Sequence, residues 1–118
     1  MGQIKDLPSD ANLGHVFKRF PKGVDHLLKY HDAVLRGPSD FTIGERELIA
    51  AYVSSLYSCY YCAGAHSVIG ETFGIEVEIF QTLIENPGTE TFSSKLSPIL
   101  NYVRKLTLNP NPRPPSGR

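Results

Sequence analysis

The sequence lacks most of the features that would place it in a specialised class of protein. Its 118 residues carry twelve basic and twelve acidic side chains. Without a basic excess, nucleic acid is a poor partner, because phosphates need a positive face. No apolar run approaches the length of a membrane span. The start, MGQIKDLPSD, has no apolar signal core, and Asp6 breaks the myristoylation pattern. We therefore expect a soluble cytoplasmic protein with no nucleic-acid or membrane partner.

Cysteine is also scarce, with Cys59 and Cys62 the only two in the chain. A bridge between residues three apart closes almost no loop, so it gains little by chain entropy and cannot join distant parts of a fold. A chain of this length can bury a core without such staples. If the two cysteines form a bond, we expect the bond to serve chemistry and not scaffolding.

Helical spacing of apolar residues dominates the sequence, and strand alternation is scarce. The clearest start signal is the capping box Thr42-Ile43-Gly44-Glu45. Gly37-Pro38 ends one helix, and Gly74 stands at a left-handed cap position after another. The pattern predicts an all-α protein of five or six helices in a single domain over residues 1–108. The proline-rich tail, 109–118, is expected to be extended or disordered. The helices are expected near residues 14–20, 21–36, 45–58, 59–73, 75–84 and 96–108.

Cys59, Cys62 and His66 stand at i, i+3 and i+7, so they share one stripe if the segment is a helix. With Ser58 as the expected N-cap, Cys59 falls in the first turn. The helix N-terminus favours a thiolate there, and a neighbouring imidazolium would lower the pKa of a thiol further. Thiolates attack peroxides and disulfides, and a second thiol can condense with the sulfenic acid that forms.

The preceding helix can supply a carboxylate to this stripe. Glu47 is expected in its first turn and begins a series of small residues that would let a second helix approach closely: Ala51, Ser54 and Ser58. A carboxylate there could orient His66 and raise its basicity. On residue type alone, a solvated carboxylate is the simpler interpretation of Glu47, and a histidine bonded to a carbonyl explains His66 equally well.

Other uses of a C-x-x-C pair stay open. A haem c site needs histidine directly after the second cysteine, where this chain has Ala63, and a thioredoxin-like site needs a preceding strand that the pattern lacks. A structural zinc site takes four ligands, so a remote histidine or a second copy would have to complete the local three. Two buried, inert cysteines beside a core histidine are the remaining interpretation. We expect no metal ion and no cofactor.

The stretch ERELIAAYVSSLYSCYYCAGAHSVIGETFGI resembles the alkylhydroperoxidase D and carboxymuconolactone decarboxylase family. The family pattern is a glutamate, eleven residues and then C-x-x-C-x-x-x-H. Here Glu47 is followed by eleven residues and then by Cys59, Cys62 and His66. The segments PSDFTIGER and LSPILNYVRKLT also look like peroxidase-related members. The similarity covers residues 8–108 in outline and is strong over 41–75.

The resemblance implies an all-helical bundle with the cysteine motif at a helix start, assembled as a homo-oligomer, either a trimer or a hexamer. It implies a thiol-dependent peroxidase in which Cys62 meets the hydroperoxide and Cys59 resolves it to a redox-active disulfide. Glu47 and His66 would form the proton relay. The electron donor would be a thiol or a dithiol, a lipoyl group among them. The decarboxylase branch generally lacks the cysteine pair, so its presence favours the redox branch.

The chain departs from the family pattern beside the cysteines. Tyr61 stands where the well-known enzymes carry a histidine, and Tyr57-Ser58 replaces the usual Asn-Gly. The chain also ends soon after YVRKLTLNP, where longer relatives continue, so a neighbouring subunit is expected to supply part of the substrate wall. The tyrosines near the motif would either line a pocket or, as we favour, pack at a subunit interface: Tyr52, Tyr57, Tyr60 and Tyr61.

Two other functions fit the same residues. The pair could act as a disulfide reductase or redox relay on a protein or lipoyl-type disulfide, with little peroxidase activity. Alternatively, the chain could be a non-enzymatic oligomeric module whose cysteines sense oxidation or are inert. Thiolate titration separates the inert pair from the other two functions, because an inert thiol titrates near the free value of about 8.5.

Overall fold

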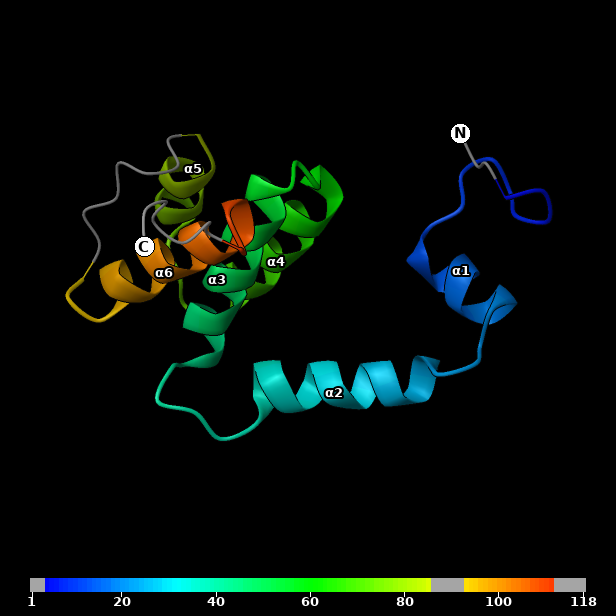
Figure 1. The fold of residues 1–118 in the computed structure, drawn as a ribbon, viewed down its shortest axis with the longest axis horizontal. Helices are drawn as coiled ribbons and strands as arrows, with labels where there is room; N and C mark the ends of the chain where they lie inside the picture. The colour runs from blue at the N-terminus through cyan, green and yellow to red at the C-terminus, as the bar shows by residue number, and fades with distance from the viewer. Residues whose placement is uncertain (1–3, 86–92, 112–118) are drawn as a thin grey trace, which may run out of the picture. The chain divides into compact units, whose positions relative to one another are not determined.

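The computed structural model describes residues 4–85 and 93–111, which form six α-helices and no strand (Figure 1). The all-α class and the number of helices expected from the sequence are therefore confirmed. Residues 112–118, most of the expected tail, lie outside the described residues. The helices are α1 (Leu13–Arg19), α2 (Val24–Arg36), α3 (Ile43–Leu56), α4 (Tyr60–Thr72), α5 (Val77–Glu85) and α6 (Leu96–Leu108).

The chain divides into two compact units, residues 1–38 and 39–118. The first contains α1 and α2, and the second contains α3 to α6 with the cysteine motif. The single domain expected over residues 1–108 stays a prediction. Within the first unit, α2 begins at Val24 and not at Pro21 as expected, because residues 21–24 form a turn. Its closing bond runs from the Val24 N–H to the Pro21 carbonyl (3.1 Å), and Gly23 has a left-handed φ of 81°.

The capping box expected at the start of α3 is confirmed. Thr42 Oγ1 accepts from the Glu45 N–H at 3.1 Å, and Glu45 Oε1 accepts from the Thr42 N–H at 2.9 Å. These bonds satisfy two amides that would otherwise have no partner in the helix. Glu45 is the acidic residue of the first turn, so Glu47 lies further into the helix than expected.

Helix α3 is the centre of the second unit, because it packs against α4, α5 and α6 (Figure 1). Burying a large apolar side chain stabilises a fold by roughly 1.5–3 kcal/mol, so this core holds α3 firmly in place. Any side chain that α3 directs towards α4 is therefore carried on a rigid support. The core consists of Leu48, Ala51 and Tyr52 from α3, Phe80 and Leu83 from α5, and Leu100 from α6.

Helices α4 and α5 approach closely at Gly70, where a Cβ would lie 3.1 Å from Cε2 and 3.3 Å from Cε1 of Phe80, and closer still to Cζ. The Phe80 ring is 2% exposed and has little room to move. Gly70→Ala is expected to lower the free energy of unfolding by about 1–3 kcal/mol, the usual cost of overpacking. Urea denaturation measures this change.

Gly64→Ala is the matched control on the same helix, because a Cβ at Gly64 meets nothing within 4 Å. Alanine in a helix interior is more stable than glycine by about 0.5–1 kcal/mol, so this variant should unfold at a higher urea concentration. If Gly70→Ala also unfolds at or above the wild-type midpoint, the close approach of α4 to Phe80 does not limit the packing.

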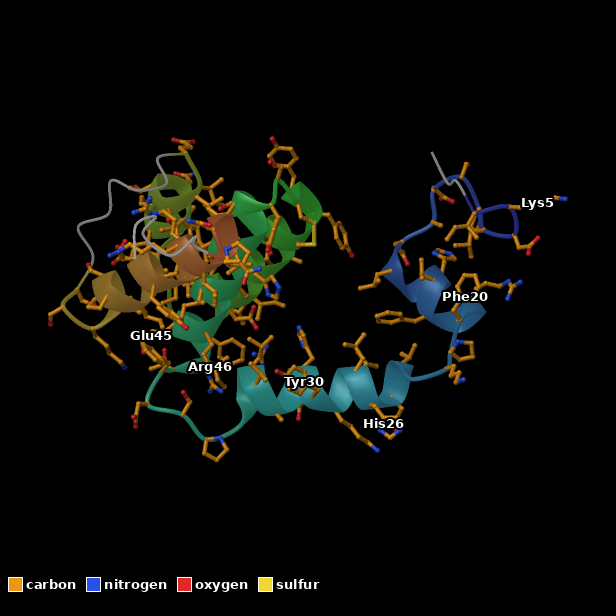
Figure 2. All side chains as sticks on the ribbon, in the orientation of Figure 1. Lys5, Phe20, His26, Tyr30, Glu45 and Arg46 are labelled. Atoms are coloured by element: carbon orange, nitrogen blue, oxygen red, sulfur yellow. A yellow bond between two sulfur atoms is a disulfide. The ribbon has the colours of Figure 1, made fainter. Side chains whose placement is uncertain are left out.

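Lys95 is the residue before α6, and its side chain contacts the start of α3. Its Nζ donates to Glu45 Oε1 at 2.8 Å and lies 5.3 Å from the centre of the Phe41 ring; Glu45 is labelled in Figure 2. Burial is the largest single influence on the pKa of Glu45 and raises it. The hydrogen bonds from Lys95 and Thr42, with the charge of Lys95, outweigh burial and leave the pKa below its ordinary value of 4.5.

A carboxyl group whose pKa is lowered by folding stabilises the fold above its unfolded pKa, and that contribution is lost as the pH falls through the folded pKa. Lys95→Met is therefore expected to lower the free energy of unfolding by about 0.5 kcal/mol near neutral pH, because the pair is partly exposed. The difference from wild type should disappear as the pH falls below 4.5. Urea denaturation across this pH range tests the prediction, and a difference independent of pH would contradict it.

Candidate functional site

The two cysteines form a disulfide at the start of α4, after the turn that ends α3. Their Cα atoms lie 5.4 Å apart, and the sulfur–sulfur bond is drawn in yellow in Figure 2. Both residues are half-buried. The disulfide therefore lies at the helix start, and its two residues are partly accessible to solvent. A thiol–disulfide exchange partner needs this access to one of the sulfurs.

Cys59 is the N-cap of α4, and Ser58 is not, which corrects the expected helix start. The Cys59 carbonyl accepts from the Ala63 N–H at 2.9 Å and so begins the helix. Cys62 is the third residue of the helix. Ser58 instead ends the turn after α3 in a left-handed conformation, with φ 57°. The sequence offered no signal for this, because residues with a Cβ rarely adopt that conformation.

Glu47 of α3 and His66 of α4 are joined across the helix pair, with 2.6 Å between Glu47 Oε2 and His66 Nδ1. The Glu47 side chain is 1% exposed and that of His66 is 20% exposed. An ionised carboxylate only accepts hydrogen bonds, so with Glu47 ionised His66 carries a hydrogen on Nδ1 and donates it. The interpretation of Glu47 as a solvated surface carboxylate is wrong.

Of the small residues expected to form one face of α3, Ala51 and Ser54 lie in the helix, whereas Ser58 lies in the turn after it. Ala51 of α3 and Ala63 of α4 are buried, and the two helices pack closely. The hydroxyls of Ser54 and Ser67 each donate to the carbonyl four residues earlier at 2.8 Å. Each of these bonds gives the hydroxyl a partner within its own helix.

The four residues of the predicted motif therefore belong to one region. The disulfide joins Cys59 to Cys62, the hydrogen bond joins Glu47 to His66, and His66 lies one helical turn after Cys62 on the same face of α4. The arrangement places two disulfide-bonded sulfurs at a helix N-terminus and an oriented imidazole one turn away. It can support thiolate formation and proton transfer.

The four tyrosines near the motif separate into two groups. Tyr52 is a core residue with no exposed surface, so neither of the two expected roles applies to it. Tyr57, Tyr60 and Tyr61, which are next to the cysteines in the sequence, are exposed.

A cavity of about 420 Å³ lies at the end of α6, lined by Arg104, Lys105, Leu108 and Asn109.

Within residues 4–85 and 93–111, no three or more histidine, cysteine, aspartate or glutamate residues form a group that could hold a metal ion. No helix in these ranges is long and apolar enough to cross a membrane.

Comparisons of the chain with known protein families, with curated proteins and with solved structures found no match. The resemblance to the alkylhydroperoxidase D family thus stays a prediction, carried by the residues of the motif.

Proposed function

We propose that this chain is a thiol-dependent peroxidase that reduces hydroperoxides with the Cys59–Cys62 pair. One observation carries the proposal: a C-x-x-C disulfide begins α4, and His66, one turn after Cys62, is held by the buried Glu47 at 2.6 Å. A buried carboxylate is costly unless it is paired. Its placement on an imidazole beside a redox disulfide is typical of a site in which a proton is transferred.

The proposed reaction begins with the reduced pair. The Cys62 thiolate attacks one oxygen of the hydroperoxide, so an S–O bond forms and the O–O bond breaks. The departing alkoxide takes a proton and leaves as an alcohol. The Cys59 thiolate then attacks the sulfenic acid sulfur, forming the disulfide and releasing hydroxide, which is protonated to water. A thiol or dithiol donor then returns two electrons and two protons.

The two cysteines receive different assistance in this scheme. A side chain at the N-cap can accept from the amides of the first turn, so the Cys59 thiolate would be stabilised by α4 itself. Cys62 lies in the first turn and is followed by His66 on the same face. Because Glu47 engages Nδ1, proton transfer to the departing oxygen would use Nε2 of His66. General acid catalysis of this kind typically contributes about 10²–10⁴-fold in rate.

The proposal is tested by mixing the fully reduced protein with an organic hydroperoxide in a stopped-flow instrument and counting thiols over time. The expected result is rapid loss of both thiols in each chain, with one disulfide formed and one alcohol released per hydroperoxide consumed. Thiols that survive for minutes in excess hydroperoxide would contradict the peroxidase function.

A disulfide reductase is the second candidate function, and the open setting of the pair favours it. Both cysteines are half-buried, and the three tyrosines next to them in the sequence are exposed. A large disulfide substrate needs such access more than a small peroxide does. If the reduced protein ignores hydroperoxides but reduces lipoamide or a protein disulfide, this second function replaces the first.

The homo-oligomer is also part of the proposal, as a trimer or hexamer in which a neighbour completes the substrate pocket. The exposed Tyr57, Tyr60 and Tyr61 support it, because tyrosine is enriched at protein interfaces. Size-exclusion chromatography with light scattering gives the mass of the assembly. A fully active monomer would exclude a pocket shared between subunits.

A further inference from the structure

Two helices in this unit end in the same hydrogen-bonded turn. After α4, the Ile75 N–H donates to the Gly70 carbonyl at 3.0 Å, and the Gly74 N–H donates to the Glu71 carbonyl at 3.1 Å. Gly74 has a left-handed φ of 96°. This is a Schellman motif. Glycine suits the left-handed place because it has no Cβ to clash with the following carbonyl.

The turn after α3 repeats these bonds with a different residue. The Cys59 N–H donates to the Ser54 carbonyl at 2.9 Å, and the Ser58 N–H donates to the Ser55 carbonyl at 3.0 Å. Ser58 takes the left-handed place with φ 57°, and within the described ranges it is the one residue other than glycine with a positive φ. The chain therefore accepts a strained residue directly before its first redox cysteine and uses glycine at the equivalent place elsewhere.

Three bonds therefore constrain Cys59. Its N–H closes the turn after α3, its carbonyl accepts from Ala63 to begin α4, and its sulfur is bonded to Cys62. All three act on the residue that directly follows Ser58. Breaking the sulfur–sulfur bond removes one of the three.

We infer that Ser58 is a positioning residue that makes the Cys59–Cys62 disulfide easier to reduce than it would be with glycine at that place. The strain at Ser58 is borne fully while the disulfide holds Cys59, and part of it is released in the dithiol. The strain therefore raises the free energy of the disulfide relative to that of the dithiol. The inference rests on the proposed function only in that the pair cycles between these two forms.

The test is the equilibrium with glutathione. One protein disulfide and two reduced glutathiones give one protein dithiol and one glutathione disulfide, so one sulfur–sulfur bond breaks, another forms, and two electrons and two protons pass to the protein. Alkylation of free thiols followed by mass spectrometry gives the equilibrium constant. Ser58→Gly is expected to lower the constant for reduction by about three- to fivefold, part of the full cost of one left-handed residue. A constant within twofold of wild type would overturn the inference.

Two further variants separate the backbone from other causes. Ser58→Ala keeps the Cβ and loses the hydroxyl, so its constant should stay near that of wild type. Gly74→Ser installs serine at the equivalent place of the other motif, where a Cβ meets nothing within 4 Å. It should lower the melting temperature but leave the constant unchanged.

A shift in Ser58→Ala equal to that in Ser58→Gly would assign the effect to the hydroxyl, and an equal shift in Gly74→Ser would assign it to general stability. Either result overturns the inference. These measurements use no peroxide, so an inactive protein in the peroxidase assay would reject the proposed function without affecting this test.

Discussion

Cys62→Ser is expected to abolish hydroperoxide consumption, lowering the rate by at least about 10³-fold. A serine hydroxyl does not ionise near neutral pH and is a far weaker nucleophile than a thiolate, so the first attack on the O–O bond is lost. The measurement is hydroperoxide consumption by reduced protein with excess dithiol. Circular dichroism should show an unchanged helical content, because the disulfide closes only a short loop and Cys62 is not part of the core.

Cys59→Ser is the matched variant for Cys62→Ser. It keeps the attacking sulfur and lacks the resolving one, so each chain should lose one thiol, form no disulfide within the chain and accumulate sulfenic acid at Cys62. A reagent specific for sulfenic acid detects this product by mass. The reverse pattern, with Cys62→Ser active and Cys59→Ser inactive, would make Cys59 the attacking residue, and its N-cap position on α4 would then explain its reactivity.

Glu47→Gln is expected to slow thiol oxidation by about 10²-fold with only a small change in stability. Glutamine has nearly the same shape and can still accept from His66, but it carries no charge to stabilise an imidazolium. Glu47→Ala should in addition lower the free energy of unfolding by about 2–4 kcal/mol, because it leaves a cavity in the packed α3–α4 contact and removes the partner of His66. Stopped-flow thiol counting and urea denaturation measure the two effects.

Glu45→Gln is the control for these variants, because Glu45 lies on the same helix but bonds Thr42 and Lys95. It should leave the rate of thiol oxidation unchanged. A pH profile of the rate separates proton transfer from simple packing, since a purely structural role for Glu47 would lower the rate equally at every pH. If the thiols of Glu47→Gln are oxidised at the wild-type rate, the Glu47–His66 pair has only a structural role.

The comparison of sequence and structure is clearest at the helix ends. The capping box at Thr42 and Glu45, the stop at Gly37 and the left-handed Gly74 were all predicted correctly. Each depends on residues within one helical turn, so the bonds that decide it are local. The spacing of Cys59, Cys62 and His66 placed them near one another for the same reason.

The residue pattern is therefore sufficient to predict an all-α chain with two cysteines at a helix start and a histidine one turn on. It does not predict that Glu47 faces inward onto His66, that Tyr52 belongs to the core, or that Ser58 takes a left-handed backbone, because these depend on contacts between helices and turns. Whether a helix face is buried depends on which other helix covers it, and composition does not encode that choice. Serine by itself avoids the left-handed region. At Ser58 it is held there by the hydrogen bonds that end α3 and begin α4 and by the disulfide at Cys59.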